Sequence, residues 1–184
     1  AFLAALDAGD RLAMAIPGYP AYRHIAAAFG IETQPIETDA ASRFQPTVEL
    51  LSALPTALTG LIVASPANPS GTMLNAEAMS KLADYCSEHH VTLISDEIYH
   101  GITYETPATT ALTATADAIV VNSFSKYYSM TGWRVGWLVV PETLTRRIEC
   151  LAQNFYISPP SLSQHAAIAA FECEDDLEFR RLST

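Results

Sequence analysis

Short apolar runs alternate with segments of helical periodicity along the chain, and this alternation limits the possible fold more than any other feature. Six runs have the length of strands, at residues 12–16, 32–36, 61–64, 91–95, 118–122 and 137–140. Most of them are followed by Pro, Gly or polar residues, which is typical of strands that end in turns. Strands that alternate with helices predict an α/β fold, with a mainly parallel (mixed) sheet and helices on both faces.

Helices are predicted between these strands. The clearest covers residues 76–89, because its apolar residues recur at helical spacing and Asn75 is placed to cap its first turn. Further helices are predicted at residues 20–29, 47–54, 142–156 and 161–173. Residues 1–6 are apolar without a basic flank, so we interpret them as the remainder of a helix and not as a signal peptide.

Composition excludes several classes of function. The 184 residues are 49% hydrophobic, which suits one domain with a substantial core. A formal charge of −10, with no basic run, argues against binding to nucleic acid or to an anionic membrane. The three cysteines and five histidines show no metal-ligand spacing, so we predict no metal site. Free thiols of this kind suggest the cytoplasm.

Candidate functional residues follow three of the predicted strands, where α/β folds gather their chemistry. SPANPSG, residues 65–71, presents Asn68 from a Pro- and Gly-rich turn, although Asn68 could also bond its own backbone. DEIY places Asp96 and Tyr99 at a strand end, where the alternative is a helix-capping Asp beside a packed Tyr. SFSKYYSMTGWRVG, residues 123–136, combines hydroxyls, an amine and a guanidinium, which suits a phosphate beside a reactive amine better than a solvated loop.

Together these segments resemble the class I and II aminotransferases of fold type I, in the aspartate aminotransferase superfamily. The patterns of that family, NPxNPTG, DExY and SxSKxxxxxGxRxG, occur here in the same order, with Ser70 in place of the usual threonine. The substitution keeps the hydroxyl group. The resemblance covers essentially the whole chain and implies a transaminase that uses pyridoxal 5′-phosphate (PLP).

The resemblance assigns a role to each residue that would face the cofactor ring. Lys126 would hold PLP as a Schiff base and move the substrate's Cα proton. Asp96 would pair with the pyridine nitrogen, and Tyr99 and Asn68 would donate to the phenolate oxygen. Tyr19, in PGYPAY after the first strand, would lie flat against the ring, although a core or turn tyrosine is also plausible.

The cofactor phosphate would be held by a second group of residues. Arg134 would grip it as a charged fork and Ser123 as a hydroxyl donor, with Ser125 as a further helper. The catalytic residues implied are therefore Lys126, Asp96 and Tyr99.

The family's chains are much longer than this one. Residues 1–184 are therefore expected to form the central part of the large cofactor-binding domain, with an N-terminal arm and glycine-rich loop and a C-terminal small domain outside it. The resemblance also implies amino acid and 2-oxo acid substrates, and a homodimer with its active site at the subunit interface.

Two other functions remain open. The same machinery serves other PLP reactions, such as those of a C–S β-lyase, a decarboxylase or a synthase. An aminotransferase-like domain can also bind ligands in a transcriptional regulator, and a basic winged helix upstream would favour that role. The amino donor and the activity of these residues alone cannot be read from the sequence.

Overall fold

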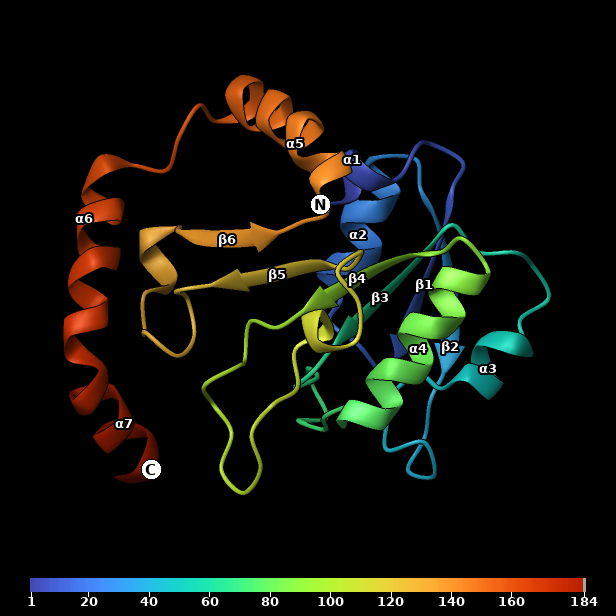
Figure 1. Cartoon of the computed structure of the whole chain (residues 1–184), viewed down its shortest axis with the longest axis horizontal. Coiled ribbons are helices and arrows are strands. Elements are labelled where there is room, and N and C mark those ends of the chain that lie inside the picture. Colours follow the sequence, from blue (N-terminus) through green and yellow to red (C-terminus); the bar gives the residue numbers. More distant parts are fainter. Residues whose placement is uncertain (184) are drawn as a thin grey trace.

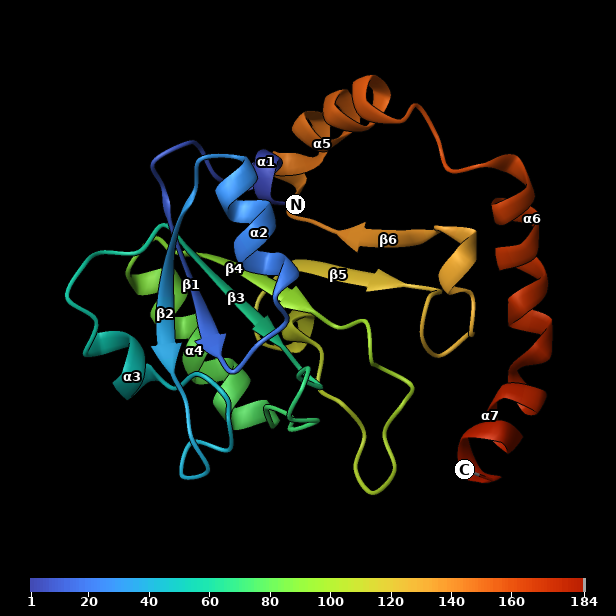
Figure 2. The same ribbon diagram turned by 180° about the vertical axis from the view of Figure 1, so that it is seen from behind.

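The computed structural model describes residues 1–183 as one six-stranded sheet covered by helices on both faces (Figures 1 and 2). The strand order is β2-β1-β3-β4-β5-β6. The strands are β1 (Arg11–Ile16), β2 (Glu32–Glu37), β3 (Gly60–Ala64), β4 (Thr92–Asp96), β5 (Ile119–Ser123) and β6 (Gly136–Val139). Strands β1 to β5 are parallel and β6 is antiparallel to β5, which confirms the predicted mixed sheet.

Within residues 1–183, every α-helix except α7 follows a predicted position, and α7 was not predicted. The α-helices are α1 (Phe2–Ala5), α2 (Ala21–Ala28), α3 (Val48–Ser52), α4 (Ala76–Glu88), α5 (Glu142–Phe155), α6 (Ser161–Ala170) and α7 (Glu174–Ser183). Asn75 caps α4 as predicted, because its Oδ1 accepts the Ala78 amide at 2.8 Å. The helix predicted over residues 161–173 was too long: it ends at Ala170, a 3₁₀ turn (Phe171–Cys173) follows, and then α7 begins.

Two cores form because side chains alternate between the faces of each strand. Ala13, Leu61 and Val63 pack on one face, where α4 contributes Met79 and Leu82. Their neighbours in the same strands, among them Leu12, Ile62 and Ile94, pack on the other face with residues of α1 and α2. Complete burial of a Leu or Ile side chain stabilises a fold by about 1.5–3 kcal/mol. Packing on both faces holds the central strands, and therefore their carboxyl ends, in fixed positions.

The far edge of the sheet is more exposed. In β6, the side chains of Trp137, Leu138 and Val139 are 36–40% exposed. Gly136 begins this strand because a Cβ there would lie 2.6 Å from the Asn122 carbonyl oxygen. Helices α6 and α7 run beside this edge rather than over the central strands (Figure 1). No helix in residues 1–183 is long and apolar enough to cross a membrane.

Candidate active site

Four strands bring predicted site residues to one edge of the sheet. Tyr19 follows β1, Asn68 follows β3, Asp96 ends β4 and Lys126 follows β5. All four line one cavity of about 100 Å³, together with Tyr99, Tyr22, Ala64 and Ile98. The structure therefore brings together the five residues that the sequence placed around the cofactor ring.

Asp96 lines this cavity and accepts two hydrogen bonds. Its Oδ2 accepts the Tyr22 hydroxyl at 2.5 Å, and its Oδ1 accepts the Ile98 amide at 3.1 Å. Burial raises the pKa of Asp96, the two donors oppose that rise, and the neighbouring Glu97 carboxylate adds to it. Burial and the adjacent Asp96 also raise the pKa of Tyr22, so this phenol remains a donor.

Tyr22 was missed in the sequence. It lies in the first turn of α2, three residues after Tyr19, and the two rings meet edge to face at 5.5 Å. A spacing of three residues places two side chains on the same side of a helical turn. That spacing was the available signal, but it does not show that the hydroxyl reaches the end of β4.

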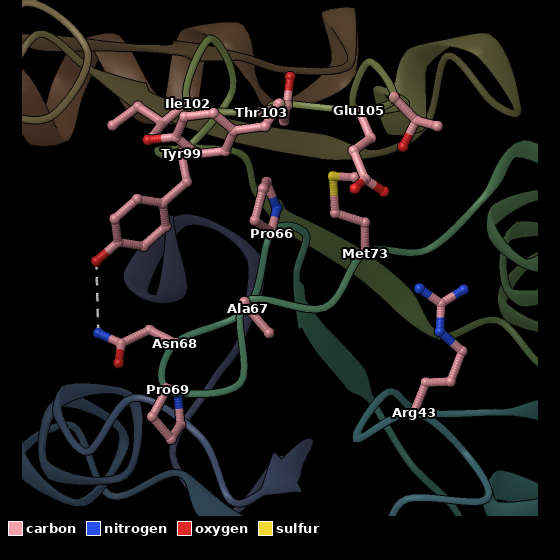
Figure 3. Close-up of a pocket in the computed structure, with 13 residues that line it drawn as sticks. Arg43, Pro66, Ala67, Asn68, Pro69, Met73, Tyr99, Ile102, Thr103 and Glu105 are labelled. Carbon is pink, nitrogen blue, oxygen red and sulfur yellow. Dashed lines mark hydrogen bonds between the residues drawn. The ribbon is translucent and has the colours of Figure 1, made fainter. Parts of the chain in front are cut away.

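Asn68 and Tyr99 form a polar pair in the wall of the cavity, and Figure 3 shows the bond between them. The Asn68 turn is closed by backbone bonds from Ala67 to Thr72, at 2.9 Å, and from Gly71 to Ala67, at 2.8 Å. The Asn68 amide then donates to the Tyr99 hydroxyl at 3.5 Å, instead of bonding its own turn. Both groups keep further hydrogen-bonding capacity for a ligand.

Lys126 brings an amine to the same cavity. Its Nζ lies 5.7 Å from the centroid of the Tyr99 ring. Within residues 1–183 the Nζ of Lys126 makes no hydrogen bond and no ion pair. A partly buried amine without a protein acceptor is available to a ligand.

The residues predicted to hold a phosphate are arranged differently. The Ser123 and Ser125 hydroxyls lie 2.8 Å apart, and Ser123 donates to the Val135 carbonyl at 3.0 Å. Arg134 is exposed, has a left-handed backbone (φ 54°) and donates to the Thr131 carbonyl at 2.8 Å. Ser123 and Arg134 line a separate cavity of about 450 Å³. Residues 1–183 thus do not gather this group around the small cavity.

A wider cavity of about 520 Å³ shares Asn68 and Tyr99 with the small one. Its lining is mostly apolar, with Arg43 and Glu105 as charged residues at its margin (Figure 3). Within residues 1–183, no group of His, Cys, Asp and Glu side chains is arranged to hold a metal ion.

Fold and cavity together define the class of protein. A mixed α/β sheet that presents an amine, a carboxylate, an amide and a phenol at its strand ends is the aminotransferase-type architecture that the motifs predicted. The chain belongs to the family described as aminotransferase class I and II, which it matches over residues 1–182.

Individual relatives agree with this assignment. The valine–pyruvate aminotransferase of Mycobacterium tuberculosis is 52% identical over 180 residues, 97% of this chain and 46% of that protein. The crystal structure of an aminotransferase from the same species superposes with a TM-score of 0.95 at 49% identity, covering 99% of this chain and 51% of that one. The aspartate aminotransferase from Thermus thermophilus with maleate gives 0.90 at 27% identity, covering 98% and 48%. The chain therefore spans about half the length of the relatives it matches.

Proposed function

We propose that the full-length protein transfers amino groups between amino acids and 2-oxo acids, with PLP as its cofactor. The observation that carries this proposal is the cavity at the strand ends, which is lined by Lys126, Asp96, Asn68, Tyr99 and Tyr19. These residues occupy the motif positions at which the family places its cofactor contacts.

The chemistry of these side chains fits PLP. The Lys126 amine has no protein acceptor within residues 1–183 and suits covalent attachment to an aldehyde. Each oxygen of Asp96 accepts one bond, so a lone pair remains for a ring nitrogen. The Tyr19 ring is 46% exposed and offers a flat surface to an aromatic ligand.

The roles of the residues follow from these properties. Bound PLP supplies an electron sink for the pair of electrons left when the amino acid loses its Cα proton. Asp96 would keep the pyridine nitrogen protonated, while Asn68 and Tyr99 would donate to the phenolate oxygen. Lys126 would take the Cα proton as a general base and return a proton as a general acid.

Ser123, Ser125 and Arg134 are proposed to hold the phosphate. Arg134 would have to exchange its bond to the Thr131 carbonyl for the phosphate oxygens. The exposed, cationic position of this side chain supports such an exchange.

The relative named for valine and pyruvate suggests an aliphatic amino donor with pyruvate as acceptor. We propose that pair as the first to test. We also propose that the full-length protein is a homodimer located in the cytoplasm. Residues 1–184 would form part of its large cofactor-binding domain. The three cysteines are free, and burial raises the pKa of Cys86 to about 12, as expected for an inert thiol.

The deciding experiment supplies the full-length protein with PLP, a panel of amino acids, and either pyruvate or 2-oxoglutarate. A transaminase forms the matching oxo acid together with alanine or glutamate. Oxo acid without a new amino acid would indicate a β-lyase, and carbon dioxide a decarboxylase. Binding without turnover, together with specific DNA binding, would support the regulator.

Lys126→Ala tests the anchor directly. We expect loss of the visible absorbance of bound PLP and a turnover at least about 1000-fold lower, because both covalent attachment and proton transfer are removed. Lys81→Ala is the matched control, since Lys81 lies on the exposed face of α4 and its ion pair within residues 1–183 is with Glu77, at 2.7 Å. Retention of the absorbance band in Lys126→Ala would disprove the assignment.

A further inference from the structure

His100 connects the two loops that carry the proposed donors to the cofactor. Its Nε2 lies 3.0 Å from the carbonyl oxygen of Ser65, and its Nδ1 lies 3.4 Å from Oε2 of Glu97. Ser65 begins the turn that carries Asn68, whereas Glu97 and His100 flank Tyr99 in the chain. The imidazole therefore bridges the segments that follow β3 and β4.

Glu97 holds one end of this bridge in place. Its side chain is only 4% exposed. Its Oε1 accepts the Ser95 hydroxyl at 3.0 Å, the Thr110 hydroxyl at 3.1 Å and the Ala111 amide at 2.8 Å. A buried carboxylate with three donors on one oxygen has little freedom to move. Its second oxygen is thus a fixed acceptor facing His100.

Both nitrogens of the His100 ring face acceptors. A carbonyl oxygen can only accept, so Nε2 must donate to Ser65. The Nδ1 lies 3.4 Å from the Glu97 carboxylate, so the same ring also contacts the segment that carries Tyr99. Two contacts from one rigid ring fix the separation of the two loops.

We propose that His100 is a positioning residue that holds Asn68 and Tyr99 where both can donate to one oxygen of the cofactor. The Asn68 amide lies 3.5 Å from the Tyr99 hydroxyl, at the outer limit of a hydrogen bond. So long a bond contributes little to holding the two loops. A backbone bond from the Ser65 amide to the Asp96 carbonyl, at 3.2 Å, joins the strand ends, and the shorter contact between His100 and Ser65 adds a link beyond them. This inference rests on the proposed function.

The test uses the full-length protein loaded with PLP and measures the pH midpoint at which the visible absorbance band changes. Donors to the phenolate oxygen favour its charged form and lower that midpoint. His100→Leu should therefore raise it by about half a pH unit or more. Asn68→Ala should raise it too, and the double variant should add little, because His100 acts through Asn68.

Two polar variants, His100→Gln and His100→Asn, distinguish an effect on the position of Asn68 from an effect on the stability of the fold. His100→Leu is also expected to destabilise the fold, since it leaves one oxygen of buried Glu97 without a partner. His100→Gln can place an amide nitrogen near the Ser65 carbonyl and should keep the wild-type midpoint. His100→Asn can donate only towards Glu97 and should shift the midpoint as His100→Leu does. Thermal unfolding of each variant gives the stability effect separately.

Unchanged midpoints in His100→Leu and His100→Asn would overturn the inference. A shift that adds fully to that of Asn68→Ala would also overturn it, because the two residues would then act independently. Failure of the proposed function is distinguishable, because the unaltered protein would then show no visible band when PLP is added.

Discussion

The centre of the sheet and its β6 edge contain similar apolar strands but bury them to very different extents. In β3 and β4, residues such as Leu61, Ile62 and Ile94 are no more than 4% exposed. In β6, Trp137 and its neighbours are 36–40% exposed, and Ile157, Leu162 and Phe179 of the C-terminal region are 71–81% exposed. Apolar surface on this scale is typical of a contact surface. The same kind of sequence run therefore forms a core at the centre of the sheet and an open edge at β6.

This difference divides the candidate site. Asp96 and Asn68 follow strands of the buried half, so their backbones are fixed by packing on both faces of the sheet. Arg134 lies beside β6 at the exposed edge, and the side-chain bond that it makes within residues 1–183 is to its own turn, at Thr131. The residues proposed to face the cofactor ring meet in one cavity within residues 1–183, whereas Ser123 and Arg134, which are proposed to hold the phosphate, line another.

Asp96→Ala should produce the largest effect on the buried half. Without a carboxylate the pyridine nitrogen loses its partner, so we expect turnover to fall at least about 1000-fold. Cofactor content should fall far less, because Lys126 still attaches the cofactor. Steady-state kinetics and absorbance of the purified protein measure the two quantities. Intact turnover would remove Asp96 from the mechanism.

Stability gives a second way to test the comparison. Ile94→Ala should lower the free energy of unfolding by about 2–5 kcal/mol, because Ile94 is fully buried. Leu162→Ala, at a side chain that is 71% exposed, should change it by about 0.5 kcal/mol or less. Urea unfolding of the full-length protein measures both. An equal loss of stability in the two variants would show that other residues cover α6 in the full-length protein. The difference in burial between β4 and α6 would then hold for residues 1–183 but not for the full-length protein.

Arg134→Ala should separate the two halves of the site. Loss of charged bonds to a phosphate should weaken PLP binding about 10–100-fold. The ring-facing residues stay in place, so turnover at saturating PLP should change much less than in Asp96→Ala. PLP titration by absorbance gives the affinity. Unaltered affinity would show that Arg134 does not bind the phosphate.

The sequence predicted the fold well because strand length and alternation depend on local patterns. Each predicted strand boundary lies within one residue of the observed one. Asp96, Asn68 and Lys126 were placed together because the carboxyl ends of parallel strands share one edge. The direction of the Arg134 side chain was not predictable, since its left-handed backbone and its bond to Thr131 arise only in the folded loop.

Tyr22 could not be assigned from the sequence for a related reason. Its bond to Asp96 joins residues 74 positions apart and depends on how α2 packs against the end of β4. A helical spacing indicates which residues share a face, but not which distant group that face meets. The residue that modulates the Asp96 carboxylate was therefore visible only in the structure.

Tyr22→Phe should have the smallest effect, and it tests whether the bond from Tyr22 sets the pKa of the Asp96 carboxylate. The Tyr22 hydroxyl favours the charged form of Asp96 and so lowers its pKa, against the rise caused by burial. Without that hydroxyl the pKa of Asp96 rises further. Pairing with the pyridine nitrogen needs the carboxylate, so it holds above this pKa and is lost as pH falls through it. The acidic limit of turnover in a pH profile should therefore move up by about 0.5–1 pH unit.

Tyr19→Phe is the matched control for Tyr22→Phe, because it also removes one phenolic hydroxyl from the same cavity. The structure shows no bond from the Tyr19 hydroxyl to Asp96, and its ring contact with residue 22 does not need that hydroxyl. The acidic limit in Tyr19→Phe should thus match that of the wild type. An equal shift in both variants would show that cavity polarity, and not the bond from Tyr22, sets the charge of Asp96. A shift in Tyr22→Phe alone would show that the buried half controls that charge through one hydrogen bond, independently of the exposed edge that carries Arg134.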